Sequence, residues 1–172
     1  SWITVYLRLT VNAGYNPAST NNILEFRTSG GSVIGKLQYN ALSATQGRVR
    51  IGNAAGDSET GWQALNYDQF YRIEIKANSD GTANGSTLKV DGTTVGSCTF
   101  TNTGANTIDH LRLEMGTNQA QQPDIYFDDL AISNSEYPGA GQVNILKPNG
   151  AGTNNQWASG TYADVDEVPH DS

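Results

Sequence analysis

Residues 71–77 read YRIEIKA, so the apolar side chains of Tyr71, Ile73 and Ile75 alternate with charged ones. Successive side chains of a β-strand point to opposite faces, and strict alternation is therefore the pattern of a half-buried strand. The turn-like stretch at 62–69 is expected to lead the chain into this strand. Residues 71–77 thus predict a sheet with one face against a core and the other towards solvent.

The same alternation recurs along the chain on both sides of residues 71–77. Further strands are predicted at 3–11, 23–28, 33–40, 49–51, 87–91, 94–100, 111–115 and 125–133. Short turns separate them, as at Ser29–Ser32 and Asp91-Gly92, and such hairpins imply antiparallel pairing because parallel neighbours need long crossovers. The sequence therefore predicts an all-β fold, a two-sheet antiparallel sandwich or lectin-like jelly roll over residues 1–133.

Residues 134–172 differ in character from the predicted sandwich. Two breaker segments rich in Gly and Pro flank Val143–Leu146, which is expected to form one more strand. Beyond them, Trp157 and Tyr162 are the only aromatic residues, too few to support a core. We expect a linker and an extended arm that docks on its own sandwich or on another chain. Because the sequence opens within a strand and breaks off abruptly, we also expect it to be part of a longer polypeptide.

The net charge of −7 is concentrated late in the chain, where residues 124–172 hold eight acidic residues and one basic residue, Lys147. An acidic chain without a basic face repels nucleic acid. No apolar run approaches the roughly 18–20 residues that a membrane helix needs. We therefore expect no nucleic-acid partner and no membrane partner.

Three stretches between residues 62 and 132 resemble the concanavalin A-like (laminin G-like) jelly rolls. They are the aromatic-led strand 67–75, the strand–Asp-Gly–strand hairpin 87–96 and the closing strand 125–132. In this order and spacing, the resemblance implies a lectin-like jelly roll over residues 1–133.

The closing strand and the residues after it also resemble structural proteins of tailed bacteriophages. This likeness rests on FDDLAI at 127–132, Pro138-Gly139, Val143–Pro148, Trp157 and the acidic stretch 164–171. In those proteins a lectin-like jelly roll is followed by such a linker and then by further sequence. The resemblance implies a component of the virion surface or tail, with other virion proteins or copies of itself as partners of residues 134–172.

Asp128 is the carboxylate whose position is most informative. It shares strand parity with Leu130 and Ile132, which are expected to face the core, whereas Asp129 is expected to face solvent. An unpaired carboxylate on the core side is costly, so Asp128 should bind backbone N–H groups, solvent at the end of the sheet, or a hard cation such as Ca²⁺. The resemblance supports the cation, because several families of this fold hold calcium near the closing strand.

The sequence lacks the residue sets of the hydrolases and lyases of this fold. A glycosidase needs two carboxylates about 5–10 Å apart, but Glu25, Glu74 and Glu114 each stand alone at positions expected to face solvent. His110 is expected on an exposed face, and no nucleophile elbow surrounds a serine. The single cysteine, Cys98, lies in a strand-like run that favours a buried small hydrophobe over a nucleophile. We therefore expect the protein not to be an enzyme.

Sugar binding remains open, because aromatic rings and amide side chains suit the apolar faces and the hydroxyls of sugars. Trp62 and Tyr67 lie in or beside Asn-rich loops and are the candidate ligand-binding residues, and Tyr15 and Trp157 share that setting. Each of these rings could instead pack beneath its loop.

Together these patterns predict a non-enzymatic structural or decoration protein at the surface of a phage virion. Its lectin-like jelly roll would cover a surface or bind cell-surface glycans. The alternative is a secreted carbohydrate-binding module of a polysaccharide-degrading enzyme. A degenerate hydrolase or lyase is the third hypothesis.

Overall fold

A computed structural model describes residues 2–11, 20–101, 107–113 and 125–134. Their regular structure is entirely β, in the strands β1 (Trp2–Val11), β2 (Thr20–Arg27), β3 (Val33–Ala41), β4 (Gln46–Asn53), β5 (Gln63–Asn66), β6 (Tyr71–Asn78), β7 (Ser86–Val90), β8 (Thr93–Cys98), β9 (His110–Leu113) and β10 (Ile125–Ser133). Across these ranges, no helix is long and apolar enough to span a bilayer. All of them belong to the unit Ser1–Gly141. The predicted linker and arm at 134–172, apart from Asn134, lies outside the described residues.

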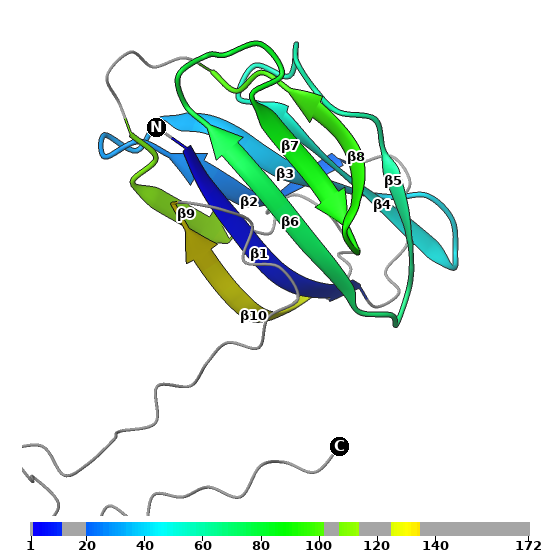
Figure 1. The fold of residues 1–172 in the computed structure, drawn as a ribbon. Coiled ribbons are helices and arrows are strands. Elements are labelled where there is room, and N and C mark those ends of the chain that lie inside the picture. Colours follow the sequence, from blue (N-terminus) through cyan, green and yellow to red (C-terminus); the bar gives the residue numbers. More distant parts are fainter. Residues whose placement is uncertain (1, 12–19, 102–106, 114–124, 135–172) are drawn as a thin grey trace, which may run out of the picture. The chain divides into compact units, whose positions relative to one another are not determined.

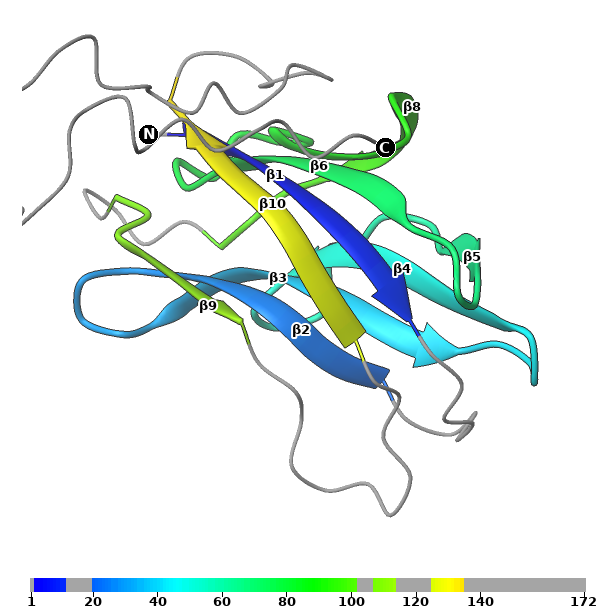
Figure 2. The ribbon, with the colours of Figure 1, turned by 90° about the horizontal axis from the view of Figure 1, so that it is seen from below.

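The strands form two five-stranded antiparallel sheets that stack face to face (Figure 1). Sheet A has the order β10-β1-β6-β7-β8, and sheet B has the order β5-β4-β3-β2-β9. Figure 2 shows the two layers from below, with β10 and β1 over the side of sheet B that holds β2 and β9. The predicted two-sheet antiparallel sandwich is confirmed.

Apolar side chains from both sheets fill the space between the layers. Ile73 and Ile75 of β6 join Leu37 and Ile51 of sheet B in one cluster, and none of these four has any exposed surface. Burying each such side chain contributes roughly 1.5–3 kcal/mol. The alternation of residues 71–77 therefore predicted the core side of sheet A correctly.

Of two turns predicted from the sequence, the one at Asp91-Gly92 is present and the one at 62–69 is present only in part. Asp91 and Gly92 both have positive φ, 49° and 80°, as a type I′ hairpin turn requires, so the predicted hairpin is confirmed. The turn predicted at 62–69 is wrong in part, because Gln63–Asn66 pairs with β4 as the edge strand β5. Four residues are too few for alternation to be visible, and pairing with a longer neighbour supplies the stabilisation instead.

The prediction that Asp128 faces the core is wrong. Asp128 is exposed, and its parity partners Leu130 and Ile132 are 49% and 56% exposed. Phe127, of the opposite parity, packs against the core cluster instead. Among the described strands, β10 lies at the edge of sheet A and pairs only with β1.

A β-bulge explains why strand parity misled at Asp128. Tyr6 of β1 pairs with Ala131, but Arg8 pairs with Asp128, so β10 holds one extra residue between these pairs. Such an insertion exchanges the faces of the bulged strand. Asp128 consequently stands opposite Arg8 in the ladder. In the described ranges, no three His, Cys, Asp or Glu side chains gather to hold a metal ion, and calcium at Asp128 stays a prediction.

Two glutamates that were predicted to face solvent are buried. Glu25 is 5% exposed and Glu74 is 3% exposed, although both lie on the outer faces of their sheets. A neighbouring arginine accompanies each carboxylate, since Arg27 pairs with Glu25 and Arg72 approaches Glu74 at 3.6 Å. The predicted side of the sheet was correct and the predicted exposure was wrong, because an ion pair compensates the buried charge. Glu114 lies outside the described residues.

The predicted burial of Cys98 is confirmed, with 1% of the residue exposed. Burial, together with the nearby negative charge of Glu59, raises the pKa of the Cys98 thiol to about 12. The thiol is therefore protonated at neutral pH and a poor nucleophile.

Candidate functional site

The outer face of sheet B bears a continuous set of polar side chains, here called the polar face. Its central members come from three adjacent strands and are Asn22, Glu25, Gln38, Asn40, Arg48 and Arg50. The ladder sets Asn22, Gln38 and Arg50 side by side in one row and Asn40 beside Arg48 in the next. Alternation along β3 and β4 puts Leu37, Tyr39, Val49 and Ile51 on the opposite, core side.

A second β-bulge brings Asn22 and Glu25 to the same face. Asn22 pairs with Gln38, but Leu24 pairs with Leu37, so Ile23 is the extra residue of β2. Two residues three positions apart then point the same way, which regular alternation forbids. The bulge thus sets the amide of Asn22 and the carboxylate of Glu25 on one face.

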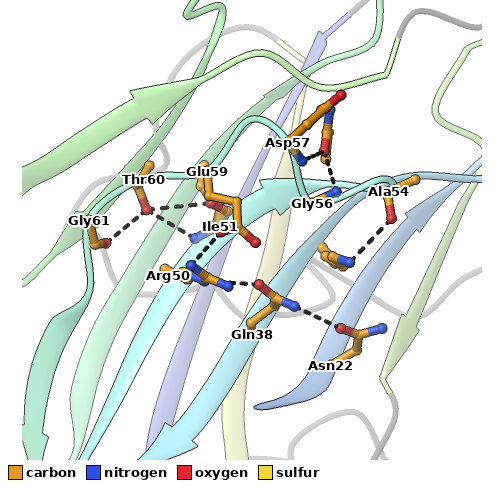
Figure 3. Close-up of polar contacts among 12 residues, drawn as sticks. Asn22, Gln38, Arg50, Ile51, Ala54, Gly56, Asp57, Glu59, Thr60 and Gly61 are labelled. Carbon is orange, nitrogen blue, oxygen red and sulfur yellow. Dashed lines mark hydrogen bonds and ion pairs between the residues drawn. The ribbon is translucent and has the colours of Figure 1, made fainter.

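A chain of hydrogen bonds crosses the polar face from strand to strand (Figure 3). Arg50 Nε donates to Gln38 Oε1 at 3.0 Å, and Gln38 Nε2 donates to Asn22 Oδ1 at 3.4 Å. Asn22 Nδ2 in turn donates to Glu25 Oε1 at 3.2 Å. An ion pair closes each end, Glu25 with Arg27 and Arg50 with Glu59. Each amide is therefore held in one orientation, which pre-organises the face for a ligand.

Trp62 lies on the same face, beside β4. The guanidinium carbons of Arg48 and Arg50 lie 4.7 and 4.3 Å from its ring centroid, which is cation–π geometry. Thr60 anchors the preceding loop, because its N–H donates to Ile51 O at 2.9 Å and its hydroxyl accepts from Ile51 N at 3.2 Å. The ring is half-buried, so part of it remains accessible on a fixed support.

Tyr67, the other predicted ligand-binding residue, lies on the opposite side of sheet B. Its ring packs against the core cluster, and its hydroxyl lies 3.2 Å from the hydroxyl of Tyr39. The Tyr67 hydroxyl donates to Ser43 O at 3.2 Å, so Tyr39 is the donor between the two phenols. The structure therefore separates Trp62 from Tyr67: the former is presented to solvent and the latter secures β5 against the sandwich.

The buried Tyr39 phenol makes stability depend on alkaline pH. Desolvation, followed by the hydrogen bond to Tyr67, raises the pKa of Tyr39 far above its ordinary value of 10.0. Above pH 10 the unfolded chain releases this proton and the folded protein keeps it, so stability falls by up to about 1.4 kcal/mol per pH unit.

We expect Tyr39→Phe to lower the stability at neutral pH by about 1 kcal/mol, because one hydrogen bond is lost. The same variant should show a shallower loss of stability above pH 10 than the parent protein. Urea unfolding of the parent protein and the variant at a series of pH values measures the free energy of unfolding at neutral pH and its slope above pH 10. Identical alkaline slopes for the two proteins would contradict the role given to Tyr39.

The remaining candidate groups do not join the polar face as a reactive set. His110 is exposed and its Nδ1 lies 2.9 Å from Asp109, in agreement with the predicted exposed position. The two carboxylates identified on the face, Glu25 and Glu59, are each engaged by an arginine. Tyr15 and Trp157 lie outside the described residues.

Sequence reasoning singled out Trp62 but missed the arginines that support it. The signal was present, because residues 48–51 read RVRI and alternation assigns both arginines to the face opposite Val49 and Ile51. What the sequence did not indicate was that the short segment 63–66 pairs with β4 and so delivers Trp62 onto them.

No protein-family model and no curated protein sequence matches this chain. Among solved structures, it is similar to the marine PL7 alginate lyase AlyA1 from Zobellia galactanivorans, with a TM-score of 0.50 and 9% identity over 77% of this chain and 61% of the lyase. It is also similar to a mutant of Trypanosoma rangeli sialidase displaying trans-sialidase activity, with a TM-score of 0.50 and 18% identity over 76% of this chain and 20% of the sialidase.

The chain thus spans less than two thirds of the length of either protein, and identities this low establish the fold alone. The likeness agrees with the jelly-roll sandwich expected from the concanavalin A-like resemblance. The resemblance to phage structural proteins stays a prediction.

Proposed function

We propose that the protein is a non-enzymatic glycan-binding jelly roll whose ligand lies on the polar face against Trp62. The supporting observation is the position of the Trp62 ring, held over two guanidinium groups at the edge of a row of amides and carboxylates. The named structural neighbours are a polysaccharide lyase and a sialidase, which is compatible with a glycan ligand on the shared fold.

The chemistry of the face suits a sugar better than an apolar ligand. A sugar ring has an apolar face that stacks on an indole, and hydroxyls that need donors and acceptors in fixed positions. The hydrogen-bonded row of Asn22, Gln38 and Arg50 supplies such groups already oriented. Because the ring and the amides are ordered before binding, little conformational entropy is lost when a ligand arrives.

The absence of catalysis is part of the proposal. Glu25 is buried and its carboxylate is engaged by Arg27, so it is not presented to a ligand as a free acid or base. Cys98 is buried and protonated. Binding without turnover therefore fits these groups best.

We further propose that the domain acts at the surface of a phage particle, on the strength of the sequence resemblance at 127–171. Residues 134–172 would then dock on other virion proteins or on copies of the same chain. Antibodies against the sandwich should label intact particles in electron micrographs. Unlabelled particles, with the protein found free in the medium, would favour the secreted carbohydrate-binding module instead.

Trp62→Ala should weaken glycan binding by about tenfold or more. The substitution removes the stacking surface, and loss of a buried aromatic contact costs on the order of 1–2 kcal/mol. A glycan array identifies a ligand with the parent protein, and titration calorimetry then compares the variants.

Tyr126→Ala is the matched control, because Tyr126 is 51% exposed on β10 of the other sheet. It should bind like the parent protein. Equal binding by Trp62→Ala and the parent would place the ligand elsewhere, and an array without any bound glycan would refute the proposed function itself.

A further inference from the structure

The polar face is rich in basic residues, although the chain as a whole is acidic. The whole chain has a net charge of −7, yet five of its ten basic residues lie on this outer face of sheet B. They are Arg27, Lys36, Arg48, Arg50 and Arg112. The sequence suggested no basic face, because these residues are spread over 27–112 and only the ladder assembles them.

Two of these cations, Lys36 and Arg48, form no ion pair with a carboxylate among the residues that the structure describes. Glu25 accompanies Arg27, and Glu59 accompanies Arg50. Lys36 donates to the backbone oxygen of Ala54 at 3.2 Å and forms no ion pair among the described residues, although Glu25 stands opposite it in the ladder. Arg48 has an amide, Asn40, as its hydrogen-bond acceptor.

Among the described residues, the hydrogen bond of Arg48 involves its Nε and not its two Nη groups. Its Nε donates to Asn40 Oδ1 at 3.1 Å, and its guanidinium carbon lies 4.7 Å from the centroid of the Trp62 ring. The described part of the chain offers no hydrogen-bond acceptor to the two Nη groups. A guanidinium fixed in this way is suited to two parallel hydrogen bonds with a carboxylate or sulfate.

The spacing of the two cations fits an extended ligand. Arg48 stands beside Asn40 in the ladder, and Lys36 lies four residues from Asn40 on β3. Four residues of a strand span about 13 Å. The row of Gln38 and Arg50 lies between the row of Arg48 and the row of Lys36. The Trp62 ring lies beside Arg48 and Arg50, at the Arg48 end of this series of rows.

We propose that the polar face selects anionic glycans, that is, sugar chains bearing carboxylate or sulfate groups, with Arg48 and Lys36 as the residues that bind the acidic groups. This inference rests on the proposed function, because it names the ligand class of the same site. The acidic remainder of the chain repels polyanions in general, so attraction is confined to ligands that fit this face.

Affinity for polygalacturonate and for dextran sulfate should exceed affinity for neutral dextran, and it should weaken as salt is added because charge screening reduces the attraction. The comparison of the two polyanions distinguishes carboxylate from sulfate as the preferred group. Arg48→Gln should weaken polyanion binding by about tenfold, the loss expected for one charge-assisted contact.

Two variants control for charge and for folding. Lys89→Gln makes the same change of charge on β7 of the other sheet and should bind like the parent protein. Arg48→Lys retains the positive charge but lacks the two parallel N–H donors of a guanidinium, so its affinity should lie between those of Arg48→Gln and the parent protein. Thermal unfolding of each variant verifies that the sandwich is intact.

Neutral dextran bound as tightly as polygalacturonate, with Arg48→Gln without effect, would overturn the selection of anionic glycans and leave the proposed function standing. Tighter binding of a single-stranded oligonucleotide than of either acidic polysaccharide would also overturn it, since a phosphate backbone would then be the preferred anion. No binding of any glycan would instead refute the proposed function.

Discussion

Phe100→Ala should destabilise the protein by about 3–5 kcal/mol, the usual cost of emptying a core site of this size. Phe100 is 1% exposed, and its ring lies 5.4 Å from that of Phe26 at 49°. It follows β8, where the chain leaves sheet A, and Thr101 N then donates to Ile34 O of sheet B at 3.0 Å. Removing the ring therefore opens a cavity where the two layers are joined.

For a chain of this length, that loss corresponds to a fall in Tm of roughly 6–20 °C. Calorimetry and urea unfolding measure it. Phe70→Ala is the matched control, because Phe70 is 41% exposed and the same deletion should cost less than about 1 kcal/mol. Equal losses in the two variants would show that Phe100 does not occupy a closed core.

Gly35→Ala is expected to destabilise the protein by about 1–3 kcal/mol through overpacking against the same ring. A Cβ at Gly35 would lie 2.3 Å from two ring carbons of Phe100, far inside van der Waals contact. The strand position itself is compatible with alanine, so the whole cost arises from the contact with Phe100. Gly30→Ala, where the nearest atom would be 3.8 Å away, should be close to neutral.

A double-mutant cycle separates this steric contact from a general weakness of β3. In the presence of Phe100→Leu, Gly35→Ala should cost much less than it does alone, because the smaller side chain leaves room for the methyl group. Strict additivity of the two changes would contradict the close approach of Gly35 and Phe100.

Alternation alone predicted most of the fold. The strands at 71–77 and 87–91 were placed within one residue of β6 and β7, because each is long enough for the period of two to appear. The bounds of β10 were also predicted, although a bulge breaks its alternation. The hairpin at Asp91-Gly92 followed from turn chemistry. These elements are encoded locally, and so a single sequence suffices to find them.

The site required information that is not local. A bulge at Ile23 brought Glu25 to the face of Asn22, and another in β10 turned Asp128 away from the core. A single extra residue moves every following side chain of the strand to the opposite face of the sheet, and the amino-acid sequence of neither strand indicates where the extra residue lies. The support of Trp62 by Arg48 depends likewise on the pairing of a four-residue edge strand.

The position of β1 also governs how the protein can fold. The first strand in chain order lies inside sheet A, where it pairs with β6 on one side and with β10 on the other. Neither partner exists when β1 leaves the ribosome, and the second is made only after residue 125. Pairing β1 with β10 requires residues more than 110 positions apart to meet, and such long-range contacts form slowly. Until they form, the apolar side chains of β1 are exposed to aggregation. Yield during synthesis should therefore depend on chaperones that hold nascent chains more than on the stability of the finished sandwich.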